Sequence, residues 1–354
     1  MIIKRMNKFF FISLIIVFLF KTGNVFSKST IFNVDNIVIN SNKIDDPDQL
    51  FDQAVKKGFE KLVKKILLTK DADIILTTST LDIKKLISSY QIIQGKKEKD
   101  KNKFIFNISF NRSKMNNFFS LKNISYADIS DTNIVLFPIL IKDNNFFLFS
   151  ENYFFNNWNE NNTDKNLDFI NYIMPIENLD DIEFINKNIN NLESIDVKKF
   201  LSNYDVDDSI LLIVKSYESK TDILLKGVAF EKVIVKNFNI IKSYDDQKKE
   251  YNFIIKNIKG EIKDIWKSQN LIDTKAASFL NITLDINNQK DLLDLQKALN
   301  EIDLIENHYV SELNKNYAKI KIKYLGKIDK IKLKFQSEGI KVKIVNNEWK
   351  LRLK

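Results

Sequence analysis

Three aspartates, Asp205, Asp207 and Asp208, stand just before the continuous apolar run Ile210–Val214. Carboxylates at this spacing can hold Ca²⁺, but the segment lacks the glycine turn and the later bidentate glutamate of an EF-hand loop. The alternative is that these side chains cap the neighbouring backbone and keep the loop solvated. We therefore predict no metal site and treat the aspartates as a ligand or partner surface.

Trp158 and Pro175 complete this predicted surface. Trp158 closes an aromatic-rich stretch that begins at Phe146, and such a density of rings can form a binding surface or pack in a core. Pro175 directly follows a predicted strand over residues 169–174. If the surface is a pocket, we expect it near Pro175 and the aspartates.

Other residue types that perform chemistry are scarce. His308 is the only histidine of the sequence, so neither a catalytic triad nor a two-histidine metal site can be built, and there is no cysteine. The 7 glycines form no phosphate-binding loop and no nucleophile elbow. We expect His308 to be a surface or packing residue, predict no cofactor, and favour binding over catalysis.

The charge pattern argues against nucleic acid as a partner. The chain has 55 basic and 46 acidic residues, and the basic ones are almost all lysines interleaved with acids. A nucleic-acid binder would be expected to cluster its charge and to use arginine. Lys319, Lys321 and Lys323 alternate along one predicted strand. They form either a solvated face or a weak contact with an anionic membrane surface.

The first residues have the three-part pattern of a secretory signal. Lys4, Arg5 and Lys8 precede an apolar run over residues 9–20, and short side chains precede a cleavage position after Ser27. The run is shorter than the ~18–20 residues of a membrane span, which favours cleavage over a retained anchor. We predict a signal peptide at 1–27 and a periplasmic protein without a lipid anchor.

The remaining chain predicts an α+β protein of three modules. The first, 28–123, contains a helix that begins at Asp46-Pro47 and carries Gly58 on its apolar stripe, which predicts close helix–sheet contact. The second, 124–240, is a mixed α/β module. Its strand 133–141 contains Pro138, which indicates an edge or a bulge.

Three consecutive strands, 210–217, 222–230 and 232–240, end the second module. The continuous apolar run at Ile210–Val214 predicts a strand covered on both faces. In the third module, 241–354, a long helix from Ser243 is expected to bridge two modules. The order β-α-β-β-α-β-β that follows predicts a ferredoxin-like split βαβ unit.

Several of these features resemble a family of exported proteobacterial proteins known as domain of unknown function 2066. The resemblance rests on the strand ending at Met174-Pro175, the acidic helix start at Asp180-Asp181, the Tyr204-Asp205 turn, Trp158 and the Phe104–Phe110 strand. The Arg-Gly pair expected before the strand that ends at Pro175 is absent. The middle module is also similar, more distantly, to the amino-terminal domain of the periplasmic Tol-system propeller protein. The resemblance implies an envelope location and no catalytic mechanism.

These observations favour a non-enzymatic envelope protein that binds or assembles other envelope proteins. Small modules with open sheet edges could accept a strand from such a partner. The alternative is an unrecognised periplasmic enzyme or small-ligand binder with a pocket in the middle module.

Overall fold

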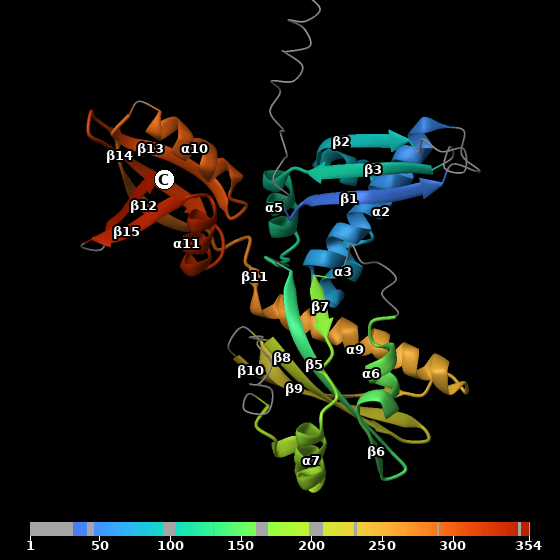
Figure 1. The fold of residues 1–354 in the computed structure, drawn as a ribbon. Helices are drawn as coiled ribbons and strands as arrows, with labels where there is room; N and C mark the ends of the chain where they lie inside the picture. Colours follow the sequence, from blue (N-terminus) through green and yellow to red (C-terminus); the bar gives the residue numbers. More distant parts are fainter. Residues whose placement is uncertain are drawn as a thin grey trace, which may run out of the picture.

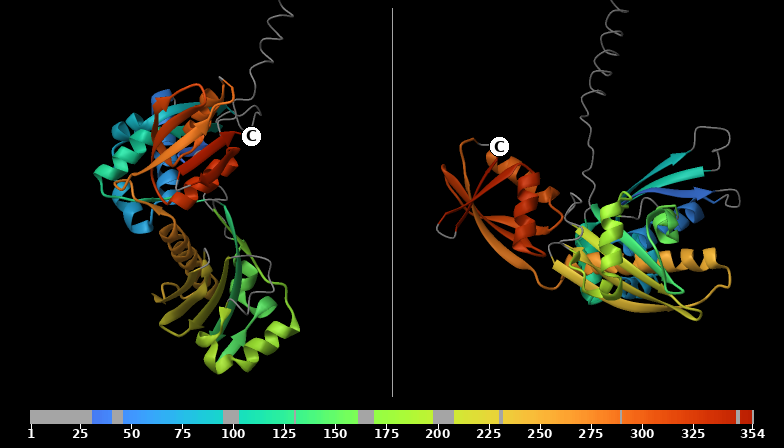
Figure 2. Two further views of the ribbon diagram at one scale, coloured as in Figure 1. Left: turned by 90° about the vertical axis from the view of Figure 1, so that its left-hand side faces the viewer. Right: turned by 60° about the horizontal axis from the view of Figure 1, so that its bottom comes forward.

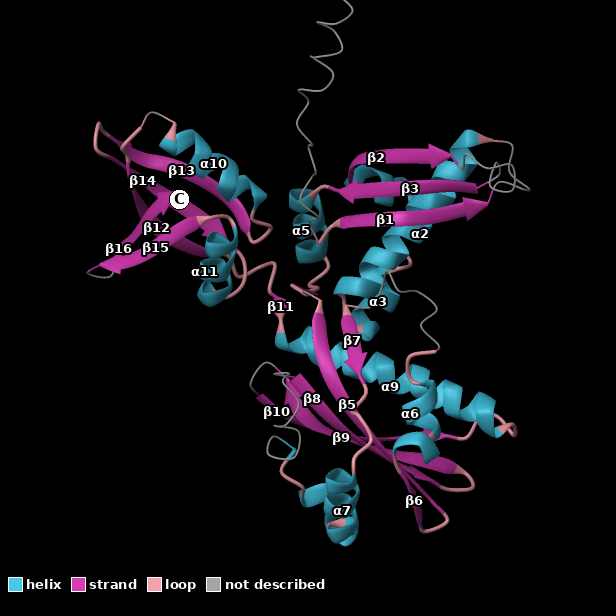
Figure 3. Cartoon of the chain, viewed as in Figure 1, coloured by secondary structure: helices cyan, strands magenta, loops and turns pink. Residues whose placement is uncertain are grey.

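The computed structural model describes residues 31–40, 46–94, 103–129, 131–160, 169–197, 208–229, 232–288, 290–345 and 348–353. These residues form an α+β protein with a three-stranded, a six-stranded and a five-stranded sheet, joined by a two-stranded pairing (Figures 1 and 3). The predicted signal peptide, Asp207 and the Tyr204-Asp205 turn lie outside the described residues.

The first sheet is antiparallel, with the order β1-β3-β2, and one long helix packs on it. Its elements are β1 (Asn33–Asn40), α2 (Pro47–Ile66), α3 (Thr69–Ile75), α4 (Thr80–Leu86), β2 (Ile87–Gln94), β3 (Lys103–Phe110) and α5 (Arg112–Leu121). Asp46 caps α2 by accepting the Asp48 N–H at 2.9 Å. A Cβ placed on Gly58 would lie 2.7 Å from Cδ1 of Ile37 on β1, so the close contact predicted at Gly58 is confirmed.

The middle sheet has the order β10-β9-β8-β5-β6, and β7 also pairs with β5. Its strands are β5 (Thr132–Lys142), β6 (Asn145–Phe147), β7 (Ile170–Ile173), β8 (Asp208–Ser216), β9 (Lys220–Ala229) and β10 (Lys232–Ile241). Strands β5 and β8 are parallel, whereas β8, β9 and β10 form an antiparallel meander.

Both faces of this sheet are covered at β8. Ile210, Leu212 and Val214 pack with helix α9 (Gln247–Gln269) on one face. Leu211 and Ile213 pack on the other face, in a core that α7 (Leu179–Lys187) and the 3₁₀ segment η3 (Ile189–Ser194) share. The two-sided burial predicted for Ile210–Val214 is therefore confirmed.

Pro138 occupies a gap in the pairing of β5. On one edge of β5, residues 132–135 pair with β7 and residues 140–142 pair with β6. Pro138 lies between the two pairings, and its carbonyl accepts a 2.9 Å hydrogen bond from the buried amide of Asn152. Because proline has no N–H to offer, a strand is best interrupted at this point. Pro138 thus marks an edge on one side of a strand that is central on the other.

Helix α9 connects the middle sheet to the first module. It starts after Asp246 rather than at Ser243, whose N–H is held instead by Glu250. Near the end of α9, Lys267 donates to the Lys64 and Leu67 carbonyls at 2.8 and 2.6 Å, where α2 ends. These bonds satisfy carbonyls that the helix leaves unpaired.

The C-terminal sheet has the order β13-β14-β12-β16-β15. Its elements are β12 (Ser278–Asp285), α10 (Asp291–Glu301), β13 (Ile305–Leu313), β14 (Tyr317–Tyr324), α11 (Ile328–Ser337), β15 (Ile340–Val345) and β16 (Glu348–Leu353). Strand β14 lies between β12 and β13, as in a split βαβ unit. The last strand, β16, and not β15, lies beside β12 and is parallel to it.

The segment between α10 and β13 contacts the first module, and the C-terminal sheet stands apart from the middle sheet (Figure 2). Arg112 on α5 donates to the Ile302 carbonyl at 2.6 Å, and Asp303 accepts the Ile31 N–H at 3.3 Å. The short strands β4 (Tyr126–Ala127) and β11 (Leu271–Ile272) pair between the modules. No helix in the described ranges has the length and apolar character needed to cross a membrane.

Candidate functional site

The outer edge of β10 is an accessible feature of the middle module. All ten residues from Lys232 to Ile241 pair with β9 in an unbroken antiparallel register. Among the described residues, no strand pairs with the other side of β10, which ends the sheet at this side (Figure 1). A free edge carries backbone N–H and C=O groups that can pair with another strand.

The hydrogen-bond pattern identifies which backbone groups of β10 are free for such pairing. The Lys242 N–H donates to the Ser219 carbonyl at 3.0 Å, just beyond the end of the β9–β10 pairing. Antiparallel strands alternate between residues that bond the neighbour and residues that point away from it. The even-numbered residues of β10 therefore bond β9. The odd-numbered ones, 233, 235, 237, 239 and 241, direct their N–H and C=O groups to the outer edge.

The side chains of the same odd-numbered residues lie on an uncovered face of the sheet. Val233, Val235 and Ile241 are 69%, 60% and 75% exposed, which is high for aliphatic side chains in a strand. Asn237 and Asn239 are also exposed and lie between them. Within the part of the chain that the structure describes, the outer edge of β10 thus combines unpaired backbone with exposed apolar side chains.

The opposite face of β10 is fixed to α9. Ile234, Phe238 and Ile240 pack against the core beneath the helix, and Lys236 forms an ion pair with Glu261 of α9. This packing holds the edge in a defined position, because it immobilises alternate side chains along the whole strand.

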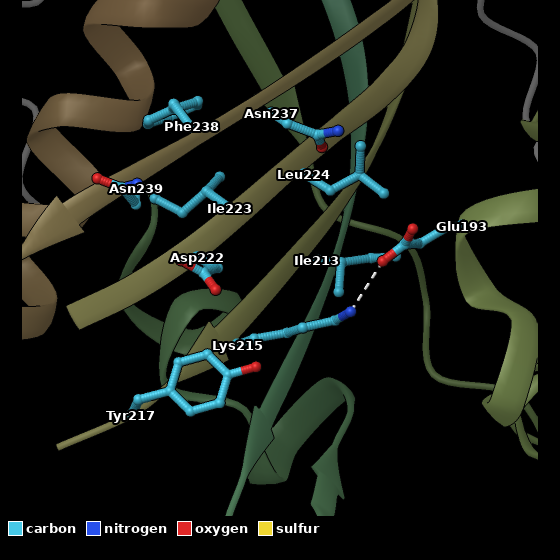
Figure 4. A pocket seen from close by; sticks show the side chains of 10 residues that line it. All are labelled: Glu193, Ile213, Lys215, Tyr217, Asp222, Ile223, Leu224, Asn237, Phe238 and Asn239. Carbon is cyan, nitrogen blue, oxygen red and sulfur yellow. Dashed lines mark hydrogen bonds and ion pairs between the residues drawn. The ribbon is translucent and has the colours of Figure 1, made fainter. Parts of the chain in front are cut away.

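A polar hollow lies beside β10 on its uncovered face (Figure 4). It has a volume of about 370 Å³, and its apolar lining includes Ile213 and Leu224. Its polar lining comprises Glu193 on η3, Lys215 on β8, Asp222 on β9, and Asn237 and Asn239 on β10; Tyr217 also lines it. The hollow forms where the covering layer of α7 and η3 ends before it reaches β10.

The charges around the hollow are paired. Lys215 bonds Glu193 at 2.8 Å, and this hydrogen bond holds the pKa of Glu193 below its usual value. Lys220 pairs with Asp222 at 3.0 Å. Lys226 donates to the Glu193 and Ile195 carbonyls at 3.0 and 2.7 Å, which fixes the wall of the hollow. The arrangement can hold a polar group of a ligand or a partner, but the described residues here form no nucleophile with an adjacent base.

The structure places Asp208 in a packing role. Its side chain is buried at the start of β8 and accepts hydrogen bonds from the Trp266 indole at 3.1 Å and the Thr132 hydroxyl at 3.3 Å. The hollow lies at the other end of β8. Asp205 and Asp207 lie outside the described residues.

Trp158 and Pro175 are also buried. The Trp158 ring packs edge-on against Tyr172 in the core beneath α9. The backbone carbonyl of Trp158 accepts a 2.6 Å hydrogen bond from the side chain of the buried Lys259. Pro175 follows β7, and Asp208 begins β8. Strand β5 lies between β7 and β8 in the sheet, so Pro175 and Asp208 are not on neighbouring strands. The aromatic-rich stretch that ends at Trp158 thus supplies core side chains such as Phe149 and Phe154.

The three lysines of β14 have neighbours that offset their charge. Lys319 pairs with Glu312 and Lys323 with Glu306, each at 2.7 Å. Lys321 lies 4.8 Å from the centre of the Phe279 ring. These contacts favour the solvated-face interpretation of the sequence over a concentrated basic patch.

The described residues contain no cluster of three or more potential metal ligands. His308 lies on β13 in a half-buried position, and burial lowers its pKa. Sequence reasoning found the β10 strand but not its free edge. In the sequence, Val233, Val235 and Ile241 alternate with residues that face the core. This alternation indicates a strand with one exposed and one packed face, but it does not show whether another strand lies beside it.

No family model, curated protein or solved structure matches the chain. The family resemblance drawn from the sequence therefore stays a prediction.

Proposed function

We propose that this is an exported, periplasmic protein that binds or assembles other envelope proteins by accepting a strand at the outer edge of β10. The leader at 1–27 motivates the location. The observation that carries the binding role is the ten-residue edge with its exposed Val233, Val235 and Ile241. Strand addition supplies affinity through backbone hydrogen bonds and specificity through alternate side chains.

A comparison with the other sheet edges supports this role. Proteins usually protect long edges with bulges, charges or proline. Of the other edge strands, β1, β2 and β13 carry register shifts, and β15 carries Lys341 and Lys343. The strands β6 and β7 have only 3 and 4 residues. Strand β10 has no register shift. Of the two lysines within its span, Lys236 points to Glu261 on α9 and Lys232 stands at the first position. An edge left open in this way is suited to receive a partner.

The test removes one outward N–H without touching the pairing with β9. Val235→Pro deletes the N–H at an outward position, which an edge strand tolerates. Val235→Thr is the matched control, because it keeps both the N–H and the β-branched shape. Thermal unfolding of both variants verifies that they are folded.

The readout is site-specific photo-crosslinking from position 241 in the cells that produce the protein. We expect a discrete crosslinked product with the otherwise unchanged chain and with Val235→Thr, and at least a tenfold loss with Val235→Pro. A product that is unaffected by Val235→Pro, or the lack of any product, would rule out strand addition at β10.

The hollow supports a second candidate function, the binding of a small polar ligand. Paired Lys215 and Glu193, two asparagines and the Tyr217 ring offer donors, acceptors and a stacking surface. A thermal-shift screen of sugars and amino acids on the protein and on Lys215→Met checks it. A compound that stabilises only the unaltered protein supports the second function, and a screen without any shift at millimolar concentration argues against it.

A further inference from the structure

We infer that the strand received at β10 is the β10 of a second copy of the chain, related to the first by a two-fold axis at Asn237. The inference rests on the proposed function, because it names the occupant of the same edge. Closed two-fold pairs are the commonest protein assemblies, and they require a surface that is complementary to itself.

The outward residues of β10 are arranged symmetrically about Asn237. In an antiparallel pairing centred there, Val233 of one copy faces Ile241 of the other, and Val235 faces Asn239. Each facing pair has its side chains on the same face of the joined sheet, since paired residues share a face. The two exposed apolar ends, Val233 and Ile241, thereby cover each other.

The inner face of β10 is compatible with the same register. Ile234 of one copy faces Ile240 of the other, and Lys236 faces Phe238, which permits a cation–π contact. Lys236 also keeps its ion pair with Glu261 of its own chain. No like charges oppose each other between Val233 and Ile241.

Neighbouring registers are less favourable. An axis at Lys236 would place Lys236 directly opposite its own copy, which is destabilising in a strand pair. An axis at Phe238 would place Val233 beyond the end of the facing β10, opposite Ser243. The pairing centred on Asn237 uses all five outward positions.

The ends of this pairing add a measurable property. Lys232 of one copy faces Lys242 of the other at each end of the joined strands. Both lysines are exposed, so their repulsion is screened by salt. The dimer should therefore become tighter, by roughly 2–5-fold in Kd, when salt rises from about 0.05 to 0.5 M.

Cysteine crosslinking tests the register, and the natural sequence has no cysteine to interfere. In the proposed register the two copies of Asn237→Cys have Cα atoms about 5.5 Å apart, which a disulfide can bridge. A cysteine at position 235 faces Asn239 of the second copy. The two cysteines of a Val235→Cys dimer are about 13 Å apart along the strand. We expect rapid oxidation to a dimer for Asn237→Cys, and for Val235→Cys only when Asn239→Cys is present in the same chain.

Leu121→Cys is the control for disulfides formed by random collision, because Leu121 lies in the first module and its side chain is 79% exposed. Sedimentation of the unaltered protein and of Val235→Pro at tens of micromolar shows whether a dimer exists and depends on the edge. If Asn237→Cys crosslinks no faster than Leu121→Cys and the protein is monomeric, the second copy is excluded as the occupant. If the photo-crosslink then still depends on the N–H at position 235, the proposed function stands and the added strand comes from a different protein. If no such photo-crosslink forms, both strand addition at β10 and the second copy are ruled out.

Discussion

Gly227 on β9 is the position at which one added methyl group should disturb the middle sheet most. A Cβ at Gly227 would lie 2.1 Å from the Ser209 carbonyl oxygen and 3.1 Å from the Cα of Ile210, both on the backbone of β8. Ordinary contact between such atoms needs about 3.5 Å, so β8 and β9 would have to separate by roughly 1 Å or more.

The cost of Gly227→Ala follows from what this separation breaks. An increase of that size lengthens the adjacent interstrand hydrogen bonds beyond useful range, and each is worth about 1 kcal/mol. Overpacking of a well-filled core costs a further 1–3 kcal/mol. We expect the free energy of unfolding to fall by about 3–5 kcal/mol, a large part of the ~5–15 kcal/mol of a typical domain.

Urea unfolding followed by tryptophan fluorescence measures this loss, because Trp158 and Trp266 both lie in the core of the middle module. Gly260→Ala is the matched control. Apart from the nearby backbone of α9 itself, no atom lies within 4 Å of a Cβ at Gly260, so alanine should stabilise by about 0.5–1 kcal/mol. A Gly227→Ala protein within about 1 kcal/mol of the unaltered one would refute the reasoning.

Three further predictions concern the supports of the sheet and its links. Asn152→Ala should cost about 2–4 kcal/mol in urea unfolding, because it leaves the buried Pro138 carbonyl without its donor; the exposed Asn156→Ala should cost less than about 1 kcal/mol. Gly58→Ala should change stability by less than about 1.5 kcal/mol, since the clash with the flexible end of Ile37 offsets the gain in helix propensity; a loss comparable to that of Gly227→Ala would contradict this. Burial lowers the pKa of Lys267 from 10.5 to about 8, so between these pH values the unfolded chain binds more protons than the folded one, and the free energy of unfolding rises with pH. From pH 7 to 10 the unaltered protein should gain up to about 3 kcal/mol of stability relative to Lys267→Met. Profiles of unfolding free energy against pH that run parallel for the two proteins would contradict this.

The sequence was most informative where the structural cause is local. The apolar run at Ile210–Val214 implies burial on both faces whatever its neighbours are, and the structure confirms it. Asp46 and Pro47 start α2 through contacts within one turn. Gly58 on an apolar stripe indicates close packing, because glycine is otherwise costly in a helix.

The sequence was least informative where partners are distant along the chain. Asp208 is held by Trp266 and Thr132, which are 58 and 76 residues away, so its packing role has no local signature. The hairpin of β15 and β16 is readable, but which of its strands joins β12 depends on the whole sheet. The same limit applies to β10, because an alternating pattern shows its two faces and not the absence of a neighbour.

Residue-resolved amide hydrogen exchange along β10 tests strand addition most directly. In the dilute protein, the amides at 233, 235, 237, 239 and 241 should exchange rapidly and those at 234, 236, 238 and 240 slowly, because only the latter bond β9. When protein concentration is raised or a binding partner is added, the odd-numbered amides should slow by at least tenfold while the even-numbered ones keep their rates. Odd-numbered amides that are already slow in the dilute protein would show that the edge is covered within one chain. Amides that stay fast under every condition would show that no strand binds there, and either result would contradict the account.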